Sequence, residues 1–156
     1  SLYATMSNMN AQRRSTVALA EERLLESGVR TTRARRLVIE KLSRLDGPRT
    51  AEEISGLLKA EVPLSSLYRT LSVLSSSGVL QRFHDGAGTA RYELGEWLTG
   101  HHHHITCTKC GSTHDVDFSS QSEEAIRRLA DEAGMAAGFD VTAHRVDLEG
   151  LCSRCR

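Results

Sequence analysis

The sequence predicts an α+β protein of two small domains, the first mainly helical and the second a short sheet with one helix. Its 156 residues, 39% of them hydrophobic, suffice for one ordinary core or two small ones. Apolar residues recur at helical spacing as far as about residue 77, and short strand-like segments dominate beyond it. All four cysteines lie in the last third, which sets the second domain apart.

The first domain is expected to start with helices. We expect residues 1–15 to form a flexible lead, because they show little apolar periodicity. Two helices are predicted next, over residues 17–27 and 32–45, and Gly28 and Gly47 terminate them.

Two further helices and a hairpin follow. Thr50 with Glu53 forms a capping box for a third helix, and a fourth begins near Ser65, after a short turn that contains proline. Segments 79–83 and 89–94 then flank a glycine-rich loop that holds His84, which is the pattern of a β-hairpin. This order predicts a winged helix-turn-helix domain over residues 16–94.

Charge separates the two parts, although the net charge of the chain is zero. Residues 1–90 carry 13 Lys/Arg against 9 Asp/Glu, whereas residues 91–156 carry 7 against 11. A basic first half favours a polyanion partner, and a helix-turn-helix suggests double-stranded DNA. The side chains expected at the DNA are those that open the fourth helix and a basic cluster before it: Ser65, Ser66, Tyr68, Arg69, Arg30, Arg33 and Arg35. Tyr68 could bond a phosphate or contact a thymine methyl group.

The second domain is expected to contain strands at 102–107, 113–118 and 139–148 and a helix at 122–137. One helix covers only one face of such a sheet. We therefore expect a second copy of the chain to cover the other face, which makes the protein a homodimer.

Two cysteine pairs, Cys107-x2-Cys110 and Cys152-x2-Cys155, stand 41 residues apart. Paired Cys-x2-Cys motifs are typical of a tetrahedral Zn²⁺ site, and four thiolates leave no open position for catalysis. The pattern therefore predicts structural zinc, with two disulfides as the disfavoured alternative.

Four consecutive histidines precede the first cysteine pair. Strand alternation directs His101 and His103 to one side and His102 and His104 to the other, so one run can supply two separate metal sites. The further ligands considered are Glu123 and His144 for the first side, and Glu93 and His84 for the second.

The ordered motifs resemble the ferric uptake regulator family of metal-responsive repressors. The resemblance starts near residue 16 and rests on LSSLYRTL at 64–71, RYEL at 91–94, the segment 101–111, and Ala143-His144 followed by the last cysteine pair. It implies a DNA-binding domain over 16–94, a hinge at 95–100 and a dimerisation domain over 101–156.

The resemblance also implies roles for the candidate ligands. It implies structural zinc at the four cysteines, a dimerisation-domain site, and a regulatory hinge site. By position, the ligands of the dimerisation-domain site are His101, His103, His144 and Glu123, with Glu124 as an alternative to Glu123. The ligands of the hinge site are His102, His104 and Glu93.

The fourth hinge ligand and the metal depart from the family's patterns. Iron and peroxide sensors of the family generally bring a histidine from the start of the third helix, and residues 48–51 contain none. Its zinc sensors often use a wing residue and a cysteine shortly before the histidines; Gln81 stands at the wing position, and this chain has no such cysteine. We expect His84 to be the fourth ligand of the hinge site, with Gln81 or a water as alternatives. Four unbroken histidines favour zinc, and Fe²⁺ or Mn²⁺ remains possible at the regulatory site.

These patterns predict a zinc-responsive repressor that binds palindromic operator DNA as a dimer. An iron- or peroxide-sensing regulator is the main alternative. A zinc hydrolase with Glu93 or Glu96 as base lacks a His-Glu-x-x-His motif, and a metal-storage protein leaves the winged helix without a role. No apolar run approaches the roughly 20 residues of a membrane span, and no signal pattern opens the chain, so we expect a cytoplasmic protein.

Overall fold

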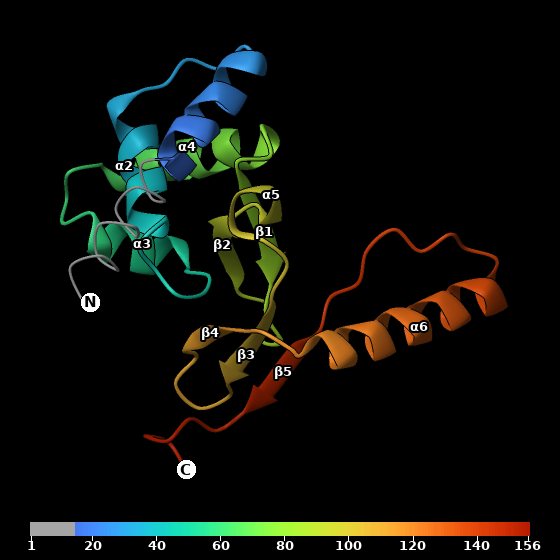
Figure 1. The fold of residues 1–156 in the computed structure, drawn as a ribbon. Coiled ribbons are helices and arrows are strands. Elements are labelled where there is room, and N and C mark those ends of the chain that lie inside the picture. Colours follow the sequence, from blue (N-terminus) through green and yellow to red (C-terminus); the bar gives the residue numbers. More distant parts are fainter. Residues whose placement is uncertain (1–14) are drawn as a thin grey trace, which may run out of the picture. The chain divides into compact units, whose positions relative to one another are not determined.

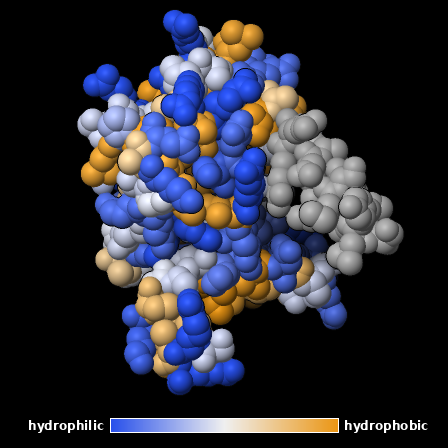
Figure 2. Space-filling view, turned by 90° about the vertical axis from the view of Figure 1, so that its left-hand side faces the viewer, coloured by the Kyte–Doolittle hydropathy of each residue, from blue (hydrophilic) through white to orange (hydrophobic). Residues whose placement is uncertain are grey.

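The computed structural model describes residues 15–156, and the chain divides into two compact units between His101 and His102 (Figure 1). Most of the predicted flexible lead, residues 1–14, lies outside the described residues. Within the described part, no helix is both long and apolar enough to cross a membrane. Hydrophilic side chains dominate the face seen in Figure 2.

The first unit is a helical bundle that ends in a hairpin. Residues 15–26 are helical, and they are followed by α2 (Arg33–Leu42), α3 (Ala51–Leu57), α4 (Leu64–Ser76), β1 (Leu80–His84), β2 (Ala90–Leu94) and α5 (Glu96–Thr99). The Thr32 hydroxyl caps α2 by accepting from Arg35 N–H, and Thr50 with Glu53 forms the predicted capping box on α3. The helix-turn-helix and the wing are therefore present in the predicted order.

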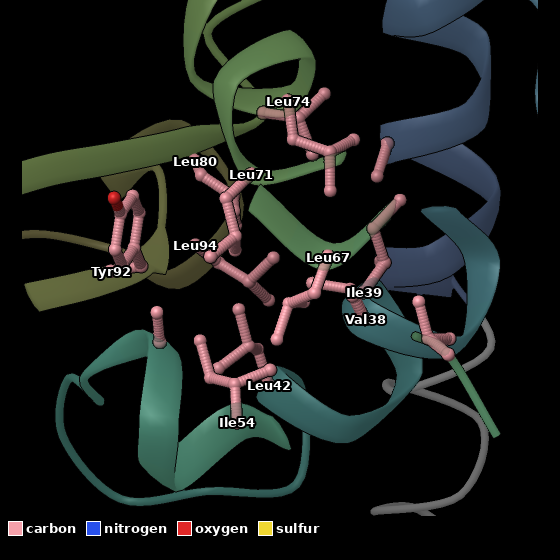
Figure 3. Close-up of a cluster of buried hydrophobic side chains, with 14 of the residues drawn as sticks. Val38, Ile39, Leu42, Ile54, Leu67, Leu71, Leu74, Leu80, Tyr92 and Leu94 are labelled. Carbon is pink, nitrogen blue, oxygen red and sulfur yellow. The ribbon is translucent and has the colours of Figure 1, made fainter. Parts of the chain in front are cut away.

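One apolar core holds this unit together. Side chains from α2, α3, α4 and the hairpin converge in it, among them Val38, Ile39, Ile54, Leu67, Leu71 and Leu94 (Figure 3). The buried stripe of α4 leaves the opposite face of that helix exposed. Residues 95–100, expected to be a hinge, contain α5, and Leu98 packs against the same core. A hinge function there stays a prediction.

The second unit contains β3 (His103–Cys107), β4 (Thr113–Val116), α6 (Ser120–Ala137) and β5 (Asp147–Gly150). The sheet order is β4-β3-β5, with β4 antiparallel and β5 parallel to β3. The α6 helix starts at the Ser119 cap and ends at Gly138, whose φ of 76° is left-handed.

Two expectations for this unit are wrong. Residues 139–146 are irregular instead of forming a strand, because pairing with β3 begins only at Asp147, opposite His104. The α6 helix extends away from the sheet and does not cover one of its faces (Figure 1). Its apolar side chains consequently stay open, with Leu129 65% and Met135 75% exposed.

Candidate metal centres and DNA-reading helix

The four cysteines meet at one end of the second unit. Cys107 ends β3, and the parallel pairing of Cys107 with Gly150 on β5 carries Cys152 and Cys155 to it. All four Sγ atoms lie within 4.8 Å of one another, and those of Cys110 and Cys152 are 3.9 Å apart. Tetrahedral Zn–S bonds of about 2.3 Å give S···S edges of about 3.8 Å, so the cluster fits zinc.

Hydrogen bonds give these four thiols different pKa values. The backbone N–H groups of Cys152 and Cys110 lower the pKa of Cys107 to about 6. Ser112 lowers the pKa of Cys110 as well, whereas the hydrogen bond with Cys152 raises the pKa of Cys155 to about 12. Crowded thiols thus ionise unequally by themselves, and a cation among them stabilises all four as thiolates.

A second cluster joins β3, α6 and the irregular segment before β5. Glu123 Oε1 lies 2.7 Å from His103 Nε2, and Glu123 Oε2 lies 3.1 Å from His144 Nε2. The Val146 N–H donates to His103 Nδ1 at 3.2 Å, which orients the fully buried ring and leaves Nε2 as the nitrogen that faces Glu123. A cavity of about 330 Å³ borders Glu123 and His144, so the cluster is accessible from solvent.

Of the two adjacent carboxylates left open by the sequence, Glu123 is the one that faces the histidines. Glu124 instead accepts from Arg127 and Arg128, and the Arg127 guanidinium holds the pKa of Glu124 below its ordinary value. The rotation of α6 therefore favours Glu123 as the ligand.

A third cluster lies on the other side of β3. The rings of His102 and His104 are 5.2 Å apart between centroids, and each Nε2 lies 3.8 Å from Asp115 Oδ1. Asp115 lies directly opposite His104 in the β3–β4 pairing. Sequence reasoning missed Asp115, although the signal was available: two predicted strands joined by a short turn pair antiparallel, which places Asp115 beside the histidines.

Three predicted ligands belong to the first unit. His101 Nδ1 lies 3.4 Å from Glu96 Oε1, and Glu93 is buried on β2 opposite Gln81. His84 ends β1 instead of lying in the loop, and it pairs with Ala90, three positions from Glu93 and on the opposite face of the hairpin. The hairpin therefore does not bring His84 and Glu93 together. The metal roles of His101 and Glu93 stay predictions.

The residues expected to read DNA gather on the open side of α4. Ser65, Ser66, Tyr68 and Arg69 are all exposed. The Tyr68 hydroxyl donates to Glu52 Oε1 on α3 at 3.0 Å, and this bond raises the pKa of Tyr68.

The basic cluster just before and within the first turn of α2 already makes contacts within the protein. Arg33 forms an exposed ion pair with Glu61 at 3.1 Å, and Arg35 donates to the carbonyl of Arg30. The exposed ion pair of Arg33 contributes little to stability, so Arg33 can exchange from Glu61 to a phosphate.

Comparison with known proteins points to one family. The model of the Ferric uptake regulator family matches residues 26–149. The peroxide operon regulator of Bacillus subtilis is 30% identical over 139 residues, covering 87% of this chain and 90% of that protein.

Solved structures agree in fold. The Vibrio cholerae ferric uptake regulator superposes with a TM-score of 0.71 at 25% identity, covering 85% of this chain and 98% of that one. A zinc-bound manganese uptake regulator gives 0.66 at 29% identity, with the same coverage.

Proposed function

This chain belongs to the ferric uptake regulator family, and we propose that it is a zinc-responsive repressor that binds palindromic operator DNA as a homodimer. It is a metal-responsive transcriptional regulator and not an enzyme. The observation that carries the proposal is the division of one histidine run into two nitrogen–oxygen clusters, one on each side of β3.

The donor types assign different tasks to the three clusters. Four thiolates saturate a tetrahedral ion and tie Cys107 to the end of the chain, which suits structural zinc. Imidazole and carboxylate ligands bind more weakly than four thiolates, so their occupancy can follow the free metal concentration. We therefore assign sensing to the histidine clusters.

The histidine content of these clusters favours zinc or iron over manganese, because imidazole suits both of these metals whereas carboxylate-rich sites suit manganese. We assign zinc on the four unbroken histidines. His103 and His144 meet a single carboxylate, Glu123, and His101 is proposed as their fourth partner. The second candidate function, an iron- or peroxide-sensing regulator, is supported by curated relatives at 30% identity that are peroxide-responsive repressors. Fe²⁺ or Mn²⁺ would then act at the regulatory site.

The regulatory site is proposed to couple metal to DNA affinity. His102, His104 and Asp115 supply its ligands from the second unit, and we propose Glu93 as the ligand from the first unit. Ligands held by both units restrict the angle between two winged helices of a dimer, so that both α4 helices can enter successive major-groove faces. To raise the population of the DNA-competent arrangement from 1% to 99%, the metal must bind that arrangement about 5.5 kcal/mol more tightly than the other one.

Homodimerisation is proposed from the exposed apolar side chains of the second unit. Leu129 and Met135 on α6 and Phe139 just beyond it are largely exposed. A second copy would remove this surface from water, as symmetric dimers of small domains do. A regulator of this kind acts on DNA in the cytoplasm, where we place it.

The test is DNA binding at buffered free metal. Protein that retains its cysteine-bound zinc is titrated with Zn²⁺, Mn²⁺ or anaerobic Fe²⁺, and its affinity is measured for a fragment selected from a random DNA pool. We expect zinc to activate binding. Activation by iron or manganese alone, or its loss on peroxide treatment, supports the alternative and contradicts the zinc assignment.

A matched pair of variants tests the regulatory site. Asp115→Ala should raise the free zinc needed for half-maximal DNA binding by about 10- to 100-fold, because it removes a carboxylate beside both histidines. Asp117→Ala removes an exposed carboxylate two residues away and should change it less than about twofold. Equal responses of the two variants would exclude Asp115 as a ligand.

A further inference from the structure

The contact between Tyr68 and Glu52 joins the DNA-reading helix to the helix before it. Tyr68 is 46% exposed on α4, and its hydroxyl donates to Glu52 Oε1 at 3.0 Å. The neighbouring Glu53 is occupied elsewhere, because its Oε2 accepts from Thr50 N–H at 2.8 Å and lies 3.5 Å from Arg91 Nη1. Of the two adjacent carboxylates, Glu52 is therefore the one that holds Tyr68.

The chemistry of this pair limits what Tyr68 can do. A phenol has one proton to donate, and a carboxylate only accepts, so the bond to Glu52 uses the single donor of Tyr68. Such a charge-assisted bond is stronger than a neutral one. The pKa of Glu52 is lowered by its own backbone N–H and by Tyr68, so the carboxylate stays ionised at neutral pH.

A DNA phosphate meets two obstacles at this position. Its oxygens must compete with the Glu52 carboxylate for the single donor of Tyr68, and the negative charge of Glu52 repels the phosphate. Base edges meet neither obstacle. The Tyr68 oxygen still has lone pairs for the amino groups of adenine and cytosine in the major groove, and the ring can contact a thymine methyl group.

We propose that Glu52 is a specificity-determining positioning residue, which accepts the only proton of the Tyr68 hydroxyl and thereby restricts Tyr68 to base-edge contacts. This rests on the proposed function, in which α4 reads operator DNA. Glu52 acts through Tyr68 and does not itself touch the operator.

The test compares a selected operator fragment with random DNA of equal length, using full-length, zinc-loaded protein. The measured quantity is the ratio of the two affinities, for the wild type, Glu52→Ala, Glu52→Gln, Tyr68→Phe and the double variant Glu52→Ala/Tyr68→Phe. Both side chains are exposed, so the variants should fold, which thermal melting verifies.

We expect Glu52→Ala to lower the ratio about 3- to 10-fold, the range set by one hydrogen bond, because the freed hydroxyl can then bond phosphates of any sequence. Glu52→Gln should stay within about twofold of the wild type, because its amide oxygen still accepts the proton. In the Tyr68→Phe background, Glu52→Ala should have no further effect on the ratio.

Three results would overturn the proposal. The first is an unchanged ratio in Glu52→Ala, and the second is an equal decrease in Glu52→Gln and Glu52→Ala, which assigns the effect to charge alone. The third is an equal loss of operator and random binding in Tyr68→Phe, which makes the hydroxyl a phosphate contact. Failure of the proposed function looks different, because the wild type then prefers no fragment over random DNA.

Discussion

Replacement of Asp85 should destabilise the wing of the first unit. Its Oδ1 accepts from the backbone N–H groups of Ala87 at 3.1 Å and Thr89 at 2.9 Å. Its Oδ2 accepts from Arg91 Nε at 2.7 Å, and the Asp85 and Arg91 side chains are only 7% and 5% exposed. One carboxylate thus closes the hairpin loop and neutralises a buried guanidinium.

The expected loss in the free energy of unfolding follows from the buried Arg91 charge that Asp85→Ala leaves without its main partner. Removal of one partner of a buried ion pair costs about 3–5 kcal/mol, because the remaining charge stays buried. Glu53 lies 3.5 Å from Arg91 Nη1 and partly compensates it, so we expect a loss of about 3 kcal/mol. The variant Asp85→Asn retains an acceptor for the two N–H groups but loses the charge, and its loss should be intermediate.

Urea unfolding followed by Trp97 fluorescence measures this loss. Trp97 is the only tryptophan of the chain and belongs to the first unit, where its Nε1 donates to the Gly78 carbonyl at 2.8 Å. The control Glu22→Ala removes an exposed carboxylate from the same unit and should stay within about 0.5 kcal/mol of the wild type. A loss below about 1 kcal/mol in Asp85→Ala would refute the reasoning.

The pH dependence gives the same argument a second readout. Burial raises the pKa of Asp85, but the Arg91 guanidinium and the Thr89 and Ala87 N–H groups outweigh it, and the net pKa is lowered. The stabilisation by Asp85 is therefore fully present above its unfolded pKa of about 3.9 and is lost as the pH falls through the lower folded pKa. The acid loss of stability should be shallower in Asp85→Ala.

Three further predictions concern the second unit. In competition titrations, Glu123→Gln should weaken metal binding beside His144 by at least about 10-fold. The control Glu124→Gln should change the metal affinity less than about twofold. The reverse order of the two effects would make Glu124 the ligand. Leu129→Glu should shift sedimentation toward monomer, because it places a charge on the apolar face of α6, and an unchanged dimer would locate the interface elsewhere. Cys110→Ser should release the structural zinc at chelator concentrations that leave the wild type loaded and should reduce the far-UV circular dichroism; retained zinc would exclude Cys110 as a ligand.

Features that depend on neighbouring residues were predictable from the sequence alone. The capping box of Thr50 and Glu53 and the helix–hairpin order follow from residue types at short spacing, and the structure reproduces them. The alternation of His103 against its neighbours is also local, because successive strand residues point to opposite faces.

The positions of α6 and the last strand were less predictable, because local patterns do not encode what covers a surface. The apolar stripe through Leu129 predicts a helix, but the same stripe suits packing on the sheet or on a partner. The alternation of apolar and polar residues after Phe139 resembles that of a strand. A strand forms only from Asp147 onward, because the backbone pairs with β3 only from there.

By itself, the sequence determined which donors this protein has and that its histidine run serves two sides of a strand. Only the tertiary structure decided which carboxylate meets which histidine. The rotation of α6 directs Glu123 to His103 and turns Glu124 toward arginines, strand pairing places Asp115 opposite His104, and the hairpin register separates His84 from Glu93. Ligand sets depend on contacts between elements distant along the chain, and helix rotation and strand register fix those contacts only when the whole unit packs.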